Sequence, residues 1–493
     1  MSSSAGSRPG REGVFRRFSR CFLDPETRYP AVTAVYLLFA AVLLFHHIPV
    51  TIWHKVMVNG GKDFRIPIAV FAVVSLLFGR LWKDKLFWIL LVLWVLKIVS
   101  VKLNWPGDLW SAQETSVYTM SAYAFFCCYA VGRCVSPRQW KPALSVFCAF
   151  WATALTVFCG FGLYVAFTGN PVSNLGNQAF TVSSDQRLQL IYHPVTSGII
   201  LSTGIPVLFL GCTLAKRKLF KALYILVAVI VFVAGSLTGT RTAYLLSGIA
   251  IAVPLCLVVY DRFHPKEQKR PPVTAGRWIL LTLLFAAVTG GIAMLQSYTL
   301  DAVNWVQEKG LFVSDASAED ESLQGITHRG FEFAVDQEVG YLSGRLVVWG
   351  NVMTVATSDA HSIFIGQSLH NPMERVNNIR EGEDLYRVSH SHSTFLQTLL
   401  ENGFPGFLLL SGFFAVFLFH AFRLLRNVDL PRWQRLLPLP VFVCLIGELV
   451  DVTSHVSYGY PSMTLLYLFA GLTVVLGRKV GKKQRGFHIS EVA

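Results

Sequence analysis

The stretch HSTFLQTLLENGFPGFLLLSGFFAVFLFHAF, residues 392–422, carries the signals that decide how this chain folds. From Phe404 to Phe422 it is almost wholly apolar, and it is long enough to cross the bilayer core as a helix, which takes about 20 residues. The part that begins at His392 is more polar and has apolar residues at helical spacing, which predicts an amphipathic segment lying near the membrane surface. Gly403 and Gly406 join the two parts, and small residues there permit a bend and close helix packing.

The rest of the chain repeats this apolar pattern. Of its 493 residues, 53% are hydrophobic and only 15% are charged, which is far from the composition of soluble globular proteins. The pattern predicts an all-α polytopic membrane protein with about twelve transmembrane helices. The expected spans are Ala31–Ile48, Ile66–Leu81, Leu86–Val101, Val117–Val131, Ala143–Phe167, Ile199–Leu214, Ala222–Leu237, Ala243–Tyr260, Trp278–Leu295, Phe404–Phe422, Leu436–Val450 and Met463–Leu476.

Arginine and lysine gather in every second loop between these spans, including both terminal tails. Short cytoplasmic loops carry such an excess, so both termini are expected on the cytoplasmic side of the plasma membrane. The same loops explain the formal net charge of +14, because basic residues at the inner leaflet attract anionic lipid. No basic surface is interleaved with aromatic residues outside these loops, so no nucleic-acid partner is expected.

The hydropathy divides the chain into five segments. The long loop at 296–393 is expected to contain structure of its own. Helical spacing within Glu332–Glu338 and Gly344–Val355 predicts helices there, with Leu346 and Val352 among the packing positions. The segments are a basic cytoplasmic tail at 1–29, expected to be disordered; transmembrane helices 1–9 at 30–295; the large extracytoplasmic loop at 296–393; the amphipathic segment and helices 10–12 at 394–477; and a basic cytoplasmic tail at 478–493.

His392 lies where the long loop re-enters the membrane. A histidine has a near-neutral pKa and can take a proton from an attacking hydroxyl, a role worth roughly 10²- to 10⁴-fold in rate. The competing interpretation is an interfacial histidine whose nitrogens are satisfied by neighbouring carbonyls. His390 is a second candidate base, two residues earlier, and Ser393 follows with a side chain that can bond to local backbone.

Two arginines are candidates for binding a diphosphate. Arg345 belongs to the long loop, and Arg241 lies at a very short junction between two spans, at the depth of lipid phosphates. An arginine fork can hold phosphate oxygens in a bidentate manner and neutralise a leaving group. The alternatives are an ion pair with one of the many loop carboxylates for Arg345 and a snorkelling side chain for Arg241.

The remaining ionisable residues near the outer boundary form a weaker group. Ionisable side chains at membrane depth are functional candidates by default, and these are placed around the site rather than in its centre. Three loop carboxylates are expected to be a solvated acidic patch, so neither a metal nor a cofactor is expected. The secondary candidates are Arg187, His193, Glu448, Asp451 and His455, and the acidic patch is Glu381, Glu383 and Asp384.

The order of these motifs resembles the O-antigen ligase and polymerase superfamily. The chain has Thr238-Gly239-Thr240-Arg241-Thr242-Ala243 at a span junction, then Gly344-Arg345 followed by Trp349, then Ile363-Phe364-Ile365-Gly366, and finally His392-Ser393 nine residues before Gly403 and Gly406. The resemblance covers roughly Arg187 to Arg423. One position departs from it, because relatives often carry asparagine where this chain has Ser393.

The resemblance implies a bacterial membrane glycosyltransferase of the GT-C type. Its donor would be a glycan linked to undecaprenyl diphosphate, used on the outer face of the plasma membrane without a metal. The loop histidine of the family corresponds to His392, its loop arginine to Arg345 and its span-junction arginine to Arg241. Together with the chemistry above, this predicts inverting transfer to an acceptor hydroxyl in the biosynthesis of a surface polysaccharide such as O-antigen, lipopolysaccharide or capsule.

Several alternatives remain open at the level of sequence. The acceptor could be a glycolipid, a glycan or a protein, so a polymerase that joins repeat units is not separated from a ligase. A transporter or flippase of lipid-linked oligosaccharide belongs to a different class, and it would need broken helices or charges at mid-membrane. A peptidoglycan glycosyltransferase also has many spans but offers no reason for the His392 motif.

Overall fold

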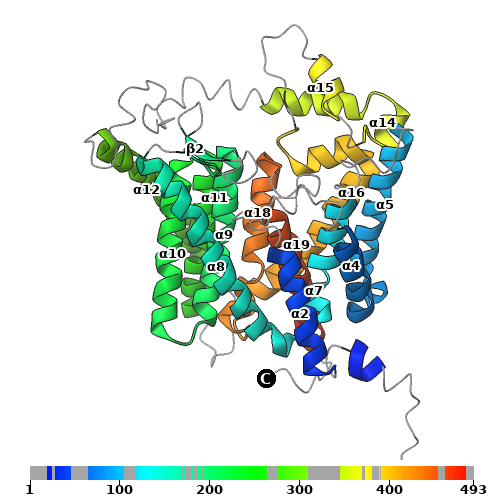
Figure 1. The fold of residues 1–493 in the computed structure, drawn as a ribbon, viewed down its shortest axis with the longest axis horizontal. Helices are drawn as coiled ribbons and strands as arrows, with labels where there is room; N and C mark the ends of the chain where they lie inside the picture. The colour runs from blue at the N-terminus through cyan, green and yellow to red at the C-terminus, as the bar shows by residue number, and fades with distance from the viewer. Residues whose placement is uncertain are drawn as a thin grey trace, which may run out of the picture.

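The structure of the chain is a computed structural model, and nearly all of what it describes is helical (Figure 1). The predicted helix Glu332–Glu338, the acidic patch, His455 and most of both basic tails lie outside the described residues. Those residues are 19–24, 28–45, 65–104, 118–168, 171–173, 179–182, 187–190, 193–263, 275–308, 345–368, 372–379, 388, 390–452 and 461–484.

Within the described part of the chain, eight helices are long and apolar enough to span a membrane. They confirm an all-α polytopic membrane protein, and each contains one of the predicted spans. Several run well past the prediction, because helices continue into the interfacial regions on either side of the apolar run. The helices are α5 (Lys85–Asn104), α8 (Pro137–Thr168), α9 (Pro194–Leu214), α10 (Lys218–Leu237), α11 (Arg241–Phe263), α12 (Ala275–Glu308), α16 (Thr394–Leu425) and α19 (Pro461–Gln484).

The other four predicted spans are shorter or interrupted helices. The first two correspond to α2 (Pro30–Phe45) and α4 (Arg65–Gly79). The third contains the π-helical turn η3 (Tyr123–Cys128) and ends at the first residue of the short helix α7 (Val131–Cys134). The fourth begins at the last residue of α17 (Arg432–Leu436) and contains α18 (Leu439–Val450). The count of twelve spans and the GT-C type therefore stay predictions.

Two helices form the centre of the bundle. In α9 and in α19, 83% of the most apolar stretch of the helix is buried inside the protein, compared with 11% in α12. α9 is packed among α8, α10, α11 and α18, and small residues allow this approach: a Cβ at Gly198 would lie 2.7 Å from the Cβ of Ala243. The position of α9 matters for the site because its first residue, Pro194, directly follows His193.

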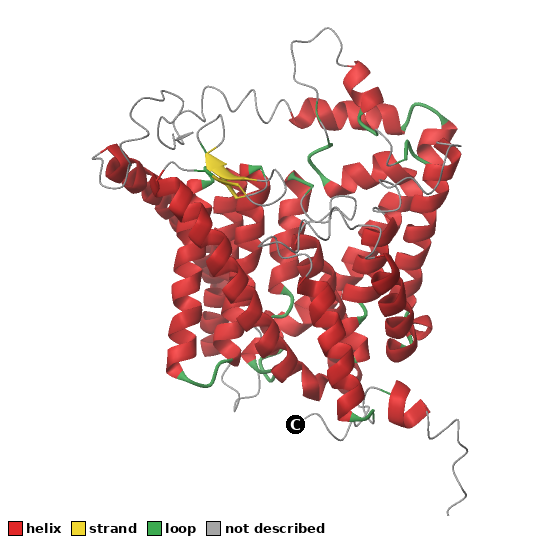
Figure 2. Cartoon of the chain, in the orientation of Figure 1, coloured by secondary structure: helices red, strands yellow, loops and turns green. Residues whose placement is uncertain are grey.

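A small antiparallel sheet lies over the end of α8 (Figure 2). It consists of β1 (Val172–Ser173), β2 (Ala179–Val182) and β3 (Leu188–Leu190) in the order β1-β2-β3. The ring of Phe180 in β2 lies 5.5 Å from that of Phe158 in α8. The serine hydroxyl of Ser197 in α9 bonds the backbone of Leu190 at 3.3 Å. The sheet thus connects α8 to the beginning of α9.

α16 is broken near its first third. Gly403 adopts φ 63° and ψ −171°, so the chain turns there between two helical parts. In Figure 1 the part before the break lies crosswise below the helices of the long loop, and the part after it descends through the bundle. The first part was expected to lie on the membrane surface, but no residue from Ser391 to Pro405 is exposed. Polar side chains on its inner side bond to α5, which draws it into the protein.

The described part of the long loop contains three helices above α16. Residues 345–356 are helical, as predicted for this stretch, and they are followed by α14 (Ala360–Phe364) and α15 (Glu374–Ile379). Val352 is buried as expected, whereas Leu346 is 55% exposed, so its expected packing role was wrong. The buried face of the 345–356 helix is Val348, Val352 and Val355, which pack with Met373, Val376 and Leu400.

Candidate functional site

His390, His392 and Asp451 meet between the start of α16 and the end of α18. Nδ1 of His392 lies 3.9 Å from Oδ1 of Asp451, and Nε2 of His390 lies 4.0 Å from the same oxygen. The two rings touch edge to face, with their centroids 4.4 Å apart. These N–O distances are too long for hydrogen bonds, but they are short enough for strong electrostatic coupling. The predicted base therefore has a carboxylate and a second imidazole beside it.

The hydrogen bonds of the two histidines assign different roles to them. The backbone N–H of His392 donates to Nδ1 of His390 at 3.2 Å. In the neutral ring the other nitrogen, Nε2, must then carry the hydrogen, and this atom faces Asp451. Nδ1 of His390 is thus occupied as a hydrogen-bond acceptor. In His392, Nδ1 is buried and forms no hydrogen bond, while the side chain as a whole is 31% exposed.

The backbone at His392 is unusual, and Ser391 fixes it. His392 has φ 52°, in the left-handed region that few residues other than glycine adopt. The backbone N–H of Ser391 donates to the side chain of Gln397 at 3.0 Å, and its hydroxyl donates to the carbonyl of Ser393 at 2.8 Å. Trp349 donates from Nε1 to the carbonyl of Ser391 at 2.9 Å. Three bonds therefore hold the turn that presents the ring.

Behind this turn, a buried polar network ties α16 to α5. Nε2 of Gln397 donates to Glu401 at 3.0 Å, and Nζ of Lys97 donates to the other carboxylate oxygen at 3.1 Å. The carbonyl of Glu401 accepts from Ser100 at 2.6 Å. The side chains of Lys97 and Glu401 are each only 2% exposed. Buried charges need this degree of pairing to be tolerated, so the network is a rigid support for the turn.

The end of α18 supports the cluster from the other side. Glu448 accepts a hydrogen bond from the hydroxyl of Thr394, the first residue of α16. Asp451 lies one turn later, at the C-cap of α18, where its backbone N–H donates to Gly447 at 2.8 Å and Oδ1 accepts from Val452 at 2.8 Å. Glu448 thus anchors the start of α16, and Asp451 is held facing the histidines.

The glycines of the motif make room for close backbone contacts. A Cβ at Gly403 would lie 2.4 Å from the carbonyl oxygen of Ile363, and its positive φ also favours glycine. A Cβ at Gly366 would lie 2.5 Å from the backbone of Glu401 and Asn402, which explains that glycine in the Ile-Phe-Ile-Gly segment. Gly406 packs against Asn402 within α16. At these glycines the long loop and α16 therefore approach backbone to backbone.

Arg345 begins the helix of residues 345–356 and lies near both histidines. Its positive charge lowers the pKa of His390 and of His392, as does the charge of His193 at the start of α9. Its Nε atom is buried and forms no hydrogen bond. Residues from the long loop, α9, α16 and α18 thus come together at one place, although they are far apart in the sequence.

The electrostatics keep His392 neutral. Burial is the largest cause and lowers its pKa to about 4, because desolvation disfavours the charged ring. Repulsion from His390, Arg345 and His193 acts in the same direction, and Asp451 opposes it. At neutral pH the ring is therefore in the form that can accept a proton.

Arg187 and Arg241 lie around a second turn, beside α9. Arg187 is buried and packs on Gly239, where a Cβ would meet its side chain at 3.0 Å. Gly239 has φ 58°, and two residues later the half-buried Arg241 begins α11. This turn contacts α9 at Gly198, five residues after His193 and thus about 7.5 Å farther along the helix. α9 connects the turn to the His392 cluster.

Among the described residues, His390, His392 and Asp451 could also hold a metal. Each offers one ligand atom, and these atoms lie within 4.8 Å of one another. Two imidazoles and a carboxylate are ligands that zinc and related ions accept. The sequence predicts no metal here, and removal of divalent cations tests that prediction.

The central part of the chain is similar to a known protein family. Residues 226–411 match the family model described as O-Antigen ligase. This match confirms the resemblance to the O-antigen ligase and polymerase superfamily. Together with the apolar helices, the match supports a multi-pass membrane protein similar to the O-antigen ligases over this region. The matched region contains Arg241, Arg345, His392, Gly403 and Gly406 but ends before Asp451. No curated protein matches the chain.

Proposed function

We propose that this chain transfers a glycan from an undecaprenyl-diphosphate-linked donor to an acceptor hydroxyl on the outer face of the bacterial plasma membrane. The observation that carries the proposal is the cluster itself. A neutral histidine, a carboxylate and an arginine are brought together from separate segments. The cluster lies within or beside the region that matches the family model.

The diphosphate needs cations more than it needs a proton. It is already a good leaving group, so stabilising its developing charge supplies most of what catalysis requires. Arg345 is near His392 and has a buried Nε that forms no hydrogen bond, so it can bind a phosphate oxygen. Arg241 and Arg187, at the turn beside α9, are placed to bind the more distant part of the diphosphate or its sugar.

His392 acts on the acceptor. The acceptor oxygen attacks the anomeric carbon of the donor, and its proton passes to Nε2 of His392. The bond between that carbon and the phosphate oxygen breaks, and the electron pair leaves with undecaprenyl diphosphate. Attack from the face opposite the leaving group inverts the anomeric centre. Asp451 faces Nδ1 at 3.9 Å and stabilises the imidazolium as it forms. No metal takes part in this scheme.

The product in the native host separates ligase from polymerase. Wild-type and His392→Ala cells are compared by resolving envelope glycans and lipid-linked intermediates by size. Single repeat units without a ladder would identify a polymerase, and long lipid-linked chains that never reach their acceptor would identify a ligase. A His390→Ala strain is the matched control, with a smaller defect expected because Nδ1 of His390 already accepts a hydrogen bond from the backbone of His392. An unchanged pattern in His392→Ala cells would reject the proposed base.

A flippase of lipid-linked oligosaccharide is the second candidate, and two features favour it: the broken helix at Gly403 and the buried pair of Lys97 and Glu401. Their pairing argues against it. Nζ of Lys97 lies 3.1 Å from the carboxylate of Glu401, and both side chains are only 2% exposed, so the two charges bind each other rather than a transported substrate. Formation of product by the purified protein from a lipid-linked oligosaccharide would exclude transport as the sole activity.

A further inference from the structure

A basic cavity lies at the end of the bundle opposite the His392 cluster. It measures about 730 Å³ and opens between α4, α7, α16 and α19. None of its lining residues is acidic. In the described part of the chain, Asp84 pairs with two of its arginines and Asp24 with a third. The cations that line the cavity are Arg80, Lys83, Arg133, Arg423, Arg478 and Lys479. They outnumber these carboxylates, so the cavity attracts anions.

His420 lines the cavity from α16, and its ring packs against the backbone of α19. The residue is only 7% exposed. Gly477 of α19 makes room for the ring, since a Cβ there would lie 2.7 Å from that of His420. The cavity is therefore a built feature of the α16–α19 contact.

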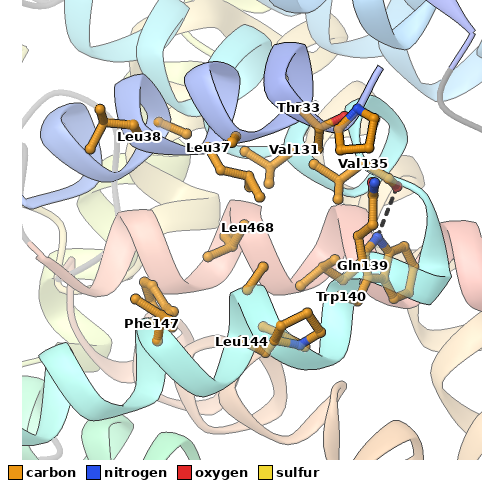
Figure 3. Close-up of a pocket in the computed structure, with 17 residues that line it drawn as sticks. Thr33, Leu37, Leu38, Val131, Val135, Gln139, Trp140, Leu144, Phe147 and Leu468 are labelled. Carbon is orange, nitrogen blue, oxygen red and sulfur yellow. Dashed lines mark hydrogen bonds between the residues drawn. The ribbon is translucent and has the colours of Figure 1, made fainter. Parts of the chain in front are cut away.

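An apolar groove of about 520 Å³ adjoins the basic cavity (Figure 3). Val135 lines both. Along α19, Leu468 and Leu472 line the groove, whereas Val475 and Lys479 line the cavity. Their spacing of three or four residues places all four on one face of the helix. A single surface therefore changes from apolar to cationic as it approaches this end of the bundle.

The groove also has a polar end. Thr33 and Gln139 lie together with Val135 at one end of Figure 3, and Leu38 and Phe147 lie at the other. Oγ1 of Thr33 and Oε1 of Gln139 are buried and form no hydrogen bond. From the cavity into the groove, the lining residues thus change from cationic to polar to apolar. This order matches the phosphate, the glycerol region and the acyl chain of a phospholipid.

We propose that an anionic phospholipid binds here, with its phosphate headgroup in the basic cavity and an acyl chain in the apolar groove. The basic loops place this end in the inner leaflet, where such lipids are abundant. The donor headgroup of the proposed reaction belongs at the opposite end, so this lipid is not the substrate. It fills the joint between α16 and α19 and stabilises the helix that carries the His392 turn at its other end.

The test is thermal unfolding of the purified full chain in a neutral detergent, with phosphatidylglycerol, phosphatidylcholine or inorganic phosphate added in turn. Phosphatidylglycerol should raise the melting temperature in a saturable manner, and the other two should not. An equal rise with phosphatidylcholine would reject an anion site. An equal rise with inorganic phosphate would show a free-anion site and overturn the lipid assignment.

Variants localise the effect. Lys83→Gln with Arg423→Gln should weaken phosphatidylglycerol binding about thirtyfold, since each basic residue near an anionic lipid contributes a factor of about five. Lys216→Gln with Lys218→Gln removes two exposed cations outside the cavity and should leave binding unchanged. Each shift is measured against the variant's own baseline. Equal binding by the two double variants would overturn the proposal.

A third variant tests the groove separately. Ala34 is exposed and lines the groove, so Ala34→Trp fills it without disturbing the core. This change should weaken binding of phosphatidylglycerol, whereas unaltered affinity would reject the acyl-chain site. If the double variant in the cavity does not fold, Lys83→Gln alone carries the test, because Lys83 is exposed; it should weaken binding about fivefold, and no change would overturn the proposal.

Discussion

Two polar clusters flank the first turns of α16, and they differ in how fully their atoms are paired. In the support network, Glu401 accepts hydrogen bonds on both carboxylate oxygens and on its carbonyl at 2.6–3.1 Å. In the His392 cluster, the ring nitrogens stay 3.9–4.0 Å from Asp451, and atoms of His392 and Arg345 are buried without a hydrogen bond. A saturated network stabilises the fold, whereas an unsaturated one retains capacity for a ligand.

The substitution Glu401→Ala tests whether the network of Lys97, Gln397 and Glu401 stabilises the fold, and we expect it to have the largest effect. It leaves Lys97 buried without its partner, so the free energy of unfolding should fall by about 3–5 kcal/mol. The loss is measured by thermal unfolding in detergent. Lys97→Met combined with Glu401→Leu removes both charges and should recover most of the stability. A Glu401→Ala protein as stable as wild type would show that the network is not a support.

Arg345→Lys tests the other cluster. Lysine keeps the charge but loses the planar fork that binds phosphate oxygens. Loss of a charge-assisted hydrogen bond of about 1.5–3 kcal/mol should lower kcat/KM roughly 10- to 100-fold. The measurement is a steady-state assay with lipid-linked donor, and the melting temperature should stay unchanged. Full activity would mean that Arg345 acts only as a point charge or not at all.

The pH dependence of kcat/KM tests the state of His392. Protonation abolishes its function as a base, and burial holds its pKa at about 4. The activity of the free enzyme should therefore stay level as the pH falls below 6.5 and decline near 4. In the donor complex the diphosphate offsets the charge of Arg345, so the acid limb of kcat should lie at higher pH. An acid limb of kcat/KM at about 6.5 would contradict the half-buried, neutral ring.

Removal of metal is expected to have the smallest effect. Activity should be the same before and after treatment with EDTA, because the proposed transfer uses only His392, Asp451 and the arginines. Activity that is lost with EDTA and restored by a divalent cation would instead place an ion between His390, His392 and Asp451, whose ligand atoms are close enough to hold one.

The fold was predictable where a long apolar run forms one unbroken helix. The prediction fell short where the backbone is interrupted inside an apolar run. The run ending at Val450 is one example: α17 ends at Leu436 and α18 begins at Leu439, with Pro438 at its N-cap. Hydropathy averages over such breaks. It therefore predicts that the segment lies in the membrane, but not where its helices begin and end.

The site was predictable only in part, for a related reason. His392, Arg345 and the glycines stand in an ordered series along the chain, whereas the support network joins Lys97 to a residue 304 positions away. Asp451 was ranked as secondary because nothing in the sequence tells that the end of α18 faces the turn at His392. The surface segment expected after His392 is buried for the same reason, since its polar residues bond to the distant α5.

The most direct test of the central claim is a paired measurement on purified His392→Ala protein, of glycan transfer from a lipid-linked donor and of thermal unfolding. If the cluster works on a ligand and the network supports the fold, transfer should fall by roughly 10²- to 10⁴-fold while the melting temperature stays at the wild-type value. Unimpaired transfer, or a loss of transfer that merely follows a loss of folded protein, would contradict it.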